Sequence, residues 1–226
     1  MGVHAERPGG ALATRPLHFV WIADSSGSMA SDGKIQSLNN AIRETIPHLR
    51  QVAESHPFAQ MLVRCIAFST GVHWHIREPT PIENLTWRDL KAGGYTHMGE
   101  ALQEVAIELS APSMERRALP PSLILISDGQ PTDDFQAGLD MLLKQPWGRQ
   151  SVRLAIAIGR DADIDVLREF MGDSGLAPVP ANNPEQLVAS IRWASVVASR
   201  LSSEPTRGFA QAQLGLEGFP DLEETW

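Results

Sequence analysis

The feature that most constrains this chain is an apolar run, residues 17–23, that leads into a short polar turn. A strand that is apolar at nearly every position suits the interior of a parallel sheet, where helices cover both faces. The segment that follows, residues 34–54, carries apolar residues three and four positions apart, which is the pattern of one helical face. Strand, loop and helix in this order predict an α/β fold. We expect the loop to lie at the carboxyl end of the strand, where such sheets bind ligands.

The same alternation of apolar runs and helical patterns continues along the chain. Further buried strands are predicted at residues 61–69, 123–126, 152–158 and 177–179. Further helices are predicted directly after Thr96 and at residues 133–144, 163–171 and 184–201. Residues 72–76 alternate after the turn Thr70-Gly71, which predicts an antiparallel edge strand, and Pro47 predicts a kink or a break in the first helix. The expected fold class is therefore a three-layer, doubly wound, Rossmann-like α/β domain with a mostly parallel sheet.

Three regions follow from this pattern. Residues 1–16 contain Gly, Pro, Arg and Ala without an apolar stretch, so we expect a disordered leader and no secretory signal. Residues 17–203 form the predicted domain, and residues 204–226 form an acidic tail with interspersed apolar residues. The carboxylates of the tail are candidate ligands for the chain's own site or a neighbouring molecule's site, and a disordered tail is the alternative.

Composition narrows the class of partner. The formal net charge is −8, which disfavours a general nucleic-acid binder and an anionic membrane surface. No apolar stretch approaches the roughly 20 residues of a membrane span. The single cysteine, Cys65, lies in an apolar run and cannot form an internal disulfide, which favours a reducing compartment. We therefore expect a soluble, cytoplasmic protein, and the sequence leaves its oligomeric state open.

Oxygen-bearing side chains gather in three loops of the expected fold. The turn after the first strand holds Asp24, Ser26 and Ser28 on alternate residues. A Gly-rich loop places Thr96 at the start of a helix, and Asp128 follows a buried strand. These are hard oxygen ligands without Cys or His, and they suit Mg²⁺ or Mn²⁺ rather than Zn²⁺.

Asp24-x-Ser26-x-Ser28, Thr96 and Asp128, in this order, resemble the metal-ion-dependent adhesion site of von Willebrand factor A domains. The resemblance covers roughly residues 17–200. It implies a Mg²⁺ ion, with Mn²⁺ as an alternative, that Ser26 and Ser28 bind directly and Thr96 binds directly or through water. It also implies that Asp24 and Asp128 act mainly through water or as hydrogen-bond acceptors, and that a partner's Asp or Glu completes the coordination.

A second resemblance concerns the segment Asp128-Gly129-Gln130-Pro131-Thr132-Asp133-Asp134. It is similar to a bacterial stand-alone subfamily associated with tellurite resistance and stress. Members of that subfamily occur alongside protein-kinase-like and PP2C-like phosphatase proteins, so the resemblance implies partners of these kinds. Composition and spacing alone do not indicate them.

The sequence is compatible with three functions. The first is a non-enzymatic, Mg²⁺-dependent protein-binding module, an adaptor or scaffold in a cytosolic bacterial stress-response or tellurite-resistance system. The second is a metal-dependent phosphohydrolase that uses Asp24 or Asp128, although Ser26 stands where the common phosphatase pattern has a second Asp. The third is a scaffold whose metal site is purely structural. Hydroxyl-rich ligation without a catalytic base favours the first, and the chain lacks a Gly-x-Ser-x-Gly elbow and a P-loop.

Four residues near these loops have two interpretations each. His73 and His75 share one face of the edge strand, but a third zinc ligand is missing, which favours an exposed edge over a zinc site. His97 is either the first residue of a helix or a group that tunes the site. Tyr95 either lines the ligand surface or packs against its own loop.

Overall fold

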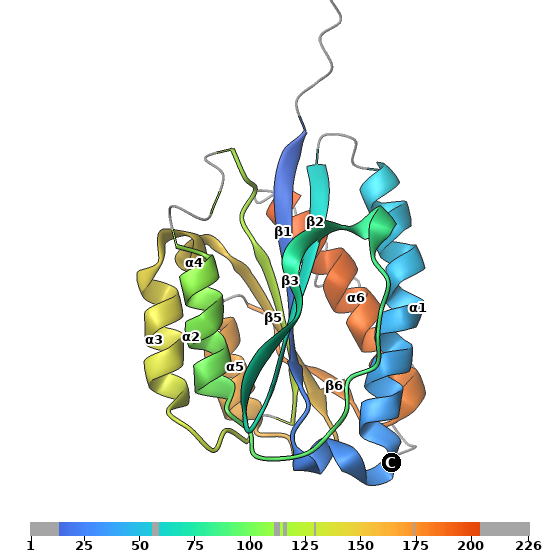
Figure 1. The fold of residues 1–226 in the computed structure, drawn as a ribbon, viewed down its shortest axis with the longest axis vertical. Helices are drawn as coiled ribbons and strands as arrows, with labels where there is room; N and C mark the ends of the chain where they lie inside the picture. Colours follow the sequence, from blue (N-terminus) through green and yellow to red (C-terminus); the bar gives the residue numbers. More distant parts are fainter. Residues whose placement is uncertain are drawn as a thin grey trace, which may run out of the picture.

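The computed structural model describes residues 14–55, 59–110, 114, 117–128, 130–173 and 175–203. Within them lies a six-stranded sheet of order β3-β2-β1-β4-β5-β6 (Figure 1). Neighbouring strands are parallel except for β3, which pairs antiparallel with β2 at one edge. The strands are β1 (Arg15–Asp24), β2 (Ala59–Ser69), β3 (Gly71–Pro81), β4 (Ser122–Ser127), β5 (Val152–Ile158) and β6 (Val179–Ala181). The predicted mostly parallel sheet with one antiparallel edge strand is confirmed.

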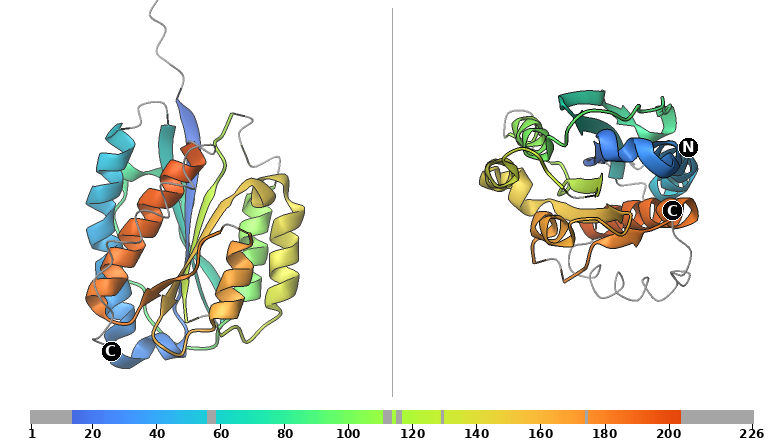
Figure 2. Two further views of the ribbon diagram at one scale, coloured as in Figure 1. Left: turned by 180° about the vertical axis from the view of Figure 1, so that it is seen from behind. Right: turned by 90° about the horizontal axis from the view of Figure 1, so that it is seen from below.

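Helices cover both faces of this sheet and make the predicted three layers (Figure 2). On one face α1 and α6 pack against each other, and Ser122 of β4 donates a hydrogen bond to Ala198 O of α6. On the other face α2 and α3 pack together, and Arg153 of β5 donates to Phe170 O of α5. The helical segments are η1 (Gly27–Gly33), α1 (Lys34–Ser55), η2 (Ile82–Asn84), α2 (Met98–Glu108), α3 (Phe135–Lys144), α4 (Pro146–Gln150), α5 (Ile164–Met171) and α6 (Pro184–Ser203).

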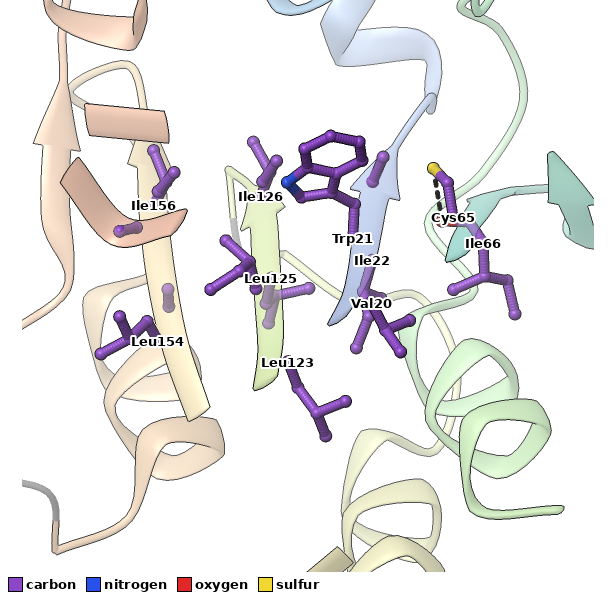
Figure 3. Close-up of a cluster of buried hydrophobic side chains, with 14 of the residues drawn as sticks. Val20, Trp21, Ile22, Cys65, Ile66, Leu123, Leu125, Ile126, Leu154 and Ile156 are labelled. Atoms are coloured by element: carbon purple, nitrogen blue, oxygen red, sulfur yellow. Dashed lines mark hydrogen bonds between the residues drawn. The ribbon is translucent and has the colours of Figure 1, made fainter. Parts of the chain in front are cut away.

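The core is centred on β1, which is buried at nine of its ten positions. Figure 3 shows Trp21 and its apolar neighbours on the adjacent strands. The Trp21 ring makes edge-on contacts with Phe19 and Trp87, at centroid separations of 5.5 and 6.0 Å. Chain connections leave β1 toward β2 and β4 toward β5, in opposite directions along the sheet. The carboxyl ends of β1 and β4 therefore flank the crevice where doubly wound sheets bind ligands.

Two local predictions were inaccurate. Of the kink or break predicted at Pro47, the break is wrong, because α1 continues through this residue. Burial of Ile42, Ile46 and Leu49 on the inner face of α1 offsets the cost of proline in a helix, about 3 kcal/mol. The edge strand is longer than the predicted 72–76, since β3 runs to Pro81. An edge strand tolerates proline because its outward N–H groups have no ladder partner.

The chain's ends bear on two further expectations. β1 begins at Arg15, two residues before the predicted start of the domain. The predicted disorder of the leader and the proposed role of the tail fall mostly on residues 1–13 and 204–226, outside the described residues. In the part of the chain that the structure describes, no helix is both long and apolar enough to cross a membrane.

Candidate metal centre

The candidate site begins at Asp24, the last residue of β1, whose side chain is completely buried. Ser127, at the end of the neighbouring strand β4, donates a hydrogen bond of 2.5 Å to Asp24 Oδ2. The backbone N–H of Ser26 donates to Asp24 Oδ1 at 2.8 Å. Both carboxylate oxygens thus accept a hydrogen bond, and the side chain is fixed between the β1 loop and β4.

Ser26 and Ser28 stand side by side in the loop after β1. Their Oγ atoms are 3.0 Å apart, and Ser26 is buried whereas Ser28 is exposed. Adjacent oxygens of an octahedral Mg²⁺ ion, each about 2.1 Å from the metal, lie about 3 Å apart. The two hydroxyls therefore already have the separation of neighbouring ligands, and Ser28 marks the side on which the site opens to solvent.

The loop that carries Thr96 is bound to the serine loop through backbone hydrogen bonds. Gly27 N donates to Gly94 O, and Gly93 N donates to Ser25 O, both at 2.9 Å. Gly94 has a φ of +84°, and a Cβ there would lie 2.4 Å from Thr70 Oγ1. Only glycine fits this close approach, so the Gly-rich sequence before Thr96 has a direct structural cause.

Thr96 is also joined to the segment that follows Asp128. Thr96 N donates to Thr132 Oγ1 at 3.0 Å, and Thr132 N donates to Thr96 O at 2.9 Å. Asp133 then accepts hydrogen bonds from Gly99 N and Glu100 N, at 2.9 and 2.8 Å, and so caps the first turn of α2. The loops of Thr96 and Asp128 are held together by this reciprocal pairing.

Asp128 supplies the second carboxylate. Its side chain is buried, and Oδ1 has no hydrogen-bond partner among the described residues. Its backbone oxygen accepts a 2.7 Å hydrogen bond from Asp163 N, which anchors the start of α5. A buried carboxylate oxygen without a donor is unfavourable, and a cation would compensate it.

The electrostatics of the site also favour a cation. Burial raises the pKa of Asp24 to about 6; hydrogen bonds from Ser127 and Ser26 lower it, and the negative charge of Asp128 raises it. A divalent ion beside these two carboxylates would stabilise their charged forms and reverse the shift. The described residues contain no group of three or more His, Cys, Asp or Glu side chains that could hold a metal, so an ion bound here would need hydroxyl ligands.

The five predicted ligands therefore occupy three adjoining loops. Direct hydrogen bonds connect Asp24, Ser26 and Ser28, and backbone or side-chain bonds tie the Thr96 and Asp128 loops to this group. The donor set consists only of hydroxyl and carboxylate oxygens, which fits Mg²⁺ or Mn²⁺. That these residues bind metal stays a prediction.

Two of the three nearby histidines, His75 and His97, make structural contacts. His73 is exposed, while His75 packs on Trp87 at 4.7 Å between ring centroids and forms a 2.7 Å hydrogen bond between its Nε2 and Arg88 O. Burial lowers the pKa of His75. His97 is the N-cap residue of α2 rather than its first helical residue, and its Nδ1 accepts a hydrogen bond from Gly71 N.

Sequence reasoning missed the residues that hold the ligands in place. Nothing in the sequence pattern assigned this role to Ser127, Thr132 or Thr70, and Asp133 was noted only as part of the segment 128–134. Asp134, the next residue, is the N-cap of α3 and accepts a bond from Ala137 N. The signal available in the sequence was position: these residues directly follow a predicted strand or precede a predicted helix.

Comparison with known proteins agrees with this architecture. The family model of the von Willebrand factor type A domain matches residues 19–187, a range that contains all five candidate ligands. A search of curated proteins finds no significant match.

Solved structures share the fold at low sequence identity. The ArnB paralog VWA2 from Sulfolobus acidocaldarius is 18% identical with a TM-score of 0.60, over 80% of this chain and 45% of that chain. Proximal thread matrix protein 1 from the mussel byssus, with a zinc-occupied MIDAS motif, is 16% identical with a TM-score of 0.60, over 83% of this chain and 48% of that chain. Manganese-loaded Plasmodium vivax TRAP is 20% identical with a TM-score of 0.53, over 78% and 72%. This chain spans about half the length of the first two proteins. Since its family model covers most of the described domain, the chain belongs to the von Willebrand factor type A domain family.

Proposed function

We propose that this chain is a non-enzymatic protein-binding module, an adaptor or scaffold, whose partner supplies an Asp or Glu carboxylate to a bound Mg²⁺ or Mn²⁺ ion. The observation that carries the proposal is the buried Oδ1 of Asp128, which has no hydrogen-bond partner among the described residues. Asp128 directly follows Ser127, which donates to the buried carboxylate of Asp24, and the paired hydroxyls of Ser26 and Ser28 lie in the loop that follows Asp24. A cation at this point would satisfy the orphan oxygen, and the exposed Ser28 leaves a direction from which a partner can approach.

The contacts of these side chains support different roles in metal binding for the serines and for Asp24. Ser26 and Ser28 are the natural direct ligands because their hydroxyls already lie at ligand spacing. Asp24 accepts hydrogen bonds on both oxygens, which suits a residue that orients the loop and acts through water. With mostly neutral direct ligands, the ion would keep a strong affinity for a further carboxylate.

The alternative of a metal-dependent phosphohydrolase fits these contacts less well. A nucleophilic Asp24 would have to reach a substrate phosphorus, yet its side chain is fully buried and bonded at both oxygens. The alternative predicts hydrolysis of p-nitrophenyl phosphate in Mg²⁺ or Mn²⁺ that is lost in Asp24→Asn. Measurable turnover of this kind would contradict the binding-module proposal.

Relatives support a divalent ion here only indirectly. A mussel byssus protein has been solved with zinc in its MIDAS motif, and the Plasmodium vivax protein has been solved loaded with manganese. At 16% and 20% identity these structures share only the fold with this chain, so the choice of ion rests on the side chains present here. The hydroxyl and carboxylate set favours Mg²⁺ or Mn²⁺ over Zn²⁺.

The cellular setting is a finer part of the proposal. The similarity of residues 128–134 to a tellurite-resistance subfamily supports a cytoplasmic role in bacterial stress signalling, with kinase-like or PP2C-like phosphatase proteins as candidate partners. In the fold, Thr132 and Asp133 of this segment hold the Thr96 loop and α2. Capture of such proteins from a bacterial lysate in Mg²⁺, but not in chelator, is the expected result.

The first experiment is a calorimetric titration of the full chain with Mg²⁺ and Mn²⁺. Saturable binding is expected in the wild type and should be lost in Ser26→Ala/Ser28→Ala. Ser55→Ala, an exposed serine at the far end of α1, serves as the matched control and should bind metal normally. Binding that survives in the double variant would contradict the assignment of these ligands.

A further inference from the structure

An exposed aromatic side chain stands directly beside the candidate metal ligands. Tyr95, the only tyrosine in the chain, precedes Thr96 in the Gly-rich loop. It is 65% exposed and heads the short set of exposed large hydrophobic side chains in the described part of the molecule, ahead of Ile107 and Ile164. The side chain of Tyr95 is therefore not part of the packed core.

The backbone under Tyr95 is fixed on several sides. Tyr95 N donates a 3.0 Å hydrogen bond to Thr70 Oγ1, and Gly94 O accepts one from Gly27 N at 2.9 Å. Thr70 leaves no room for a side chain at position 94, which is why this residue is a glycine. An aromatic ring on such a support loses little conformational entropy when a partner binds, which is the property of tyrosines that anchor recognition surfaces.

The ring is also oriented by its neighbour. Tyr95 and His97 stack with an interplanar angle of 12° and a centroid separation of 6.4 Å. His97 Nδ1 accepts a hydrogen bond from Gly71 N, and Glu100 Oε2 lies 3.1 Å from the same nitrogen. Tyr95, His97 and Glu100 thus form one continuous surface, here named the Tyr95 platform, from the metal loop to the first turn of α2.

The platform carries one carboxylate, that of Glu100, which lies within ion-pair distance of His97 Nδ1. Glu100 is 47% exposed at its side chain, and among the described residues no lysine or arginine forms a salt bridge with it. The protein as a whole carries a net charge of −8. An aromatic face beside an exposed carboxylate complements a guanidinium group, which stacks on the ring and pairs with the carboxylate.

We propose that the Tyr95 platform binds an arginine of the partner that lies close in sequence to the acidic residue on the metal. The inference rests on the proposed function and adds the class of partner, a protein segment with an acid and a neighbouring arginine. Tyr95 adjoins the ligand Thr96, and successive Cα atoms are about 3.8 Å apart. An arginine one or two positions from the acid in an extended segment, at about 3.3 Å per residue, spans this distance.

The test uses an array of short Gly/Ser peptides with a central Asp, Glu or Asn. Each peptide carries Arg, Lys, Leu, Phe, Glu or Ser at one of the two positions on either side. The labelled full chain is applied in Mg²⁺ or in chelator. We expect binding that needs both Mg²⁺ and a central acid, and that is several-fold stronger with Arg nearby than with Ser.

Variants separate the platform from the metal site. Tyr95→Ala should abolish the advantage of Arg and keep the Mg²⁺-dependent requirement for an acid. Tyr95→Phe should retain the advantage because the aromatic face remains, and Glu100→Gln should reduce it. Ile107→Ala, which truncates another exposed apolar residue near the far end of α2, is the matched control and should leave the pattern unchanged.

Two failures are distinguishable. In the first, binding depends on Mg²⁺ and on the acid but shows no Arg preference, shows a Leu or Phe preference instead, or keeps its Arg preference in Tyr95→Ala. Each of these results overturns the proposed role of the Tyr95 platform and leaves the proposed function intact. Absence of any Mg²⁺-dependent, acid-dependent binding contradicts the proposed function, and the platform falls with it.

Discussion

Ser127 Oγ donates a 2.5 Å hydrogen bond to Asp24 Oδ2, and this contact joins residues that are 103 positions apart in the chain. It crosses from β4 to β1, the two strands whose carboxyl ends flank the candidate metal centre. Together with the hydrogen bond from Ser26 N, this contact fixes the orientation of the Asp24 side chain. The ligand loop therefore takes its position from the sheet as well as from its own sequence.

Replacement of Ser127 tests this relationship. Ser127→Ala would leave Asp24 Oδ2 without its buried donor, so the metal-free protein should lose about 1–3 kcal/mol of unfolding free energy. Mg²⁺ affinity should also fall, because Asp24 would no longer be held in place. Urea denaturation and calorimetric titration measure the two effects. Ser151→Ala, at a serine remote from the site, is the control, and an unchanged Ser127→Ala protein would show that the bond contributes nothing.

The raised pKa of Asp24, about 6, predicts how stability varies with pH in the absence of metal. Between pH 3.8, the ordinary pKa of an aspartate, and about pH 6, the folded state binds more protons at Asp24 than the unfolded state does. The contribution of this group to stability is therefore present at low pH and is lost as pH rises through 6. A bound cation would remove this loss, since it stabilises the carboxylate.

The measurement is thermal unfolding at pH 5, 6, 7 and 8, with Mg²⁺ and with chelator. The increase in melting temperature caused by Mg²⁺ should grow from pH 5 to pH 8, because protons compete with the ion at Asp24. In Asp24→Asn the increase should be small at every pH. A Mg²⁺ effect of equal size at pH 5 and pH 8 would count against Asp24 as part of the site.

The course of the chain was largely predictable, for a physical reason. A strand such as residues 17–23 can be apolar at nearly every position only if helices cover both of its faces, and this condition favours a parallel α/β sheet. The spacing of Asp24, Ser26 and Ser28 likewise marks a candidate ligand loop in the sequence. Both signals are local, so a sequence displays them directly.

Other features depend on contacts between segments that are distant in the sequence, so local sequence patterns do not predict them. Asp133 caps α2 rather than its own helix, because the pairing of Thr132 with Thr96 carries it there. Pro47 remains inside α1 because packing against the sheet outweighs a local preference. The orientation of Tyr95, open from the sequence, depends on Thr70 and His97.

The pKa of His18 predicts a pH dependence of stability opposite to that predicted for Asp24. It is buried on β1, both ring nitrogens lack a hydrogen-bond partner among the described residues, and burial together with the charge of Arg64 lowers its pKa to about 4. A depressed histidine pKa contributes stability above the unfolded value of 6.5, which is lost as pH falls through 4. His18→Leu should therefore weaken acid destabilisation, measured by urea unfolding at pH 7 and pH 5. A larger loss of stability at pH 5 than in the wild type would contradict this account.

The contact between α2 and α3 supplies the last test. A Cβ at Gly138 would lie 2.2 Å from Gly99 O, so Gly138→Ala must push the two helices apart and should cost about 1–3 kcal/mol of stability. Because Asp133, two residues before α3, holds the first turn of α2 through Gly99 N, the displacement should also reach Thr96 and weaken Mg²⁺ binding. Gln136→Ala, at an exposed position of the same helix, should change neither quantity. Urea unfolding and metal titration of both variants decide the matter: a Gly138→Ala protein that is destabilised yet binds Mg²⁺ normally would show that the α2–α3 packing supports the fold without positioning Thr96.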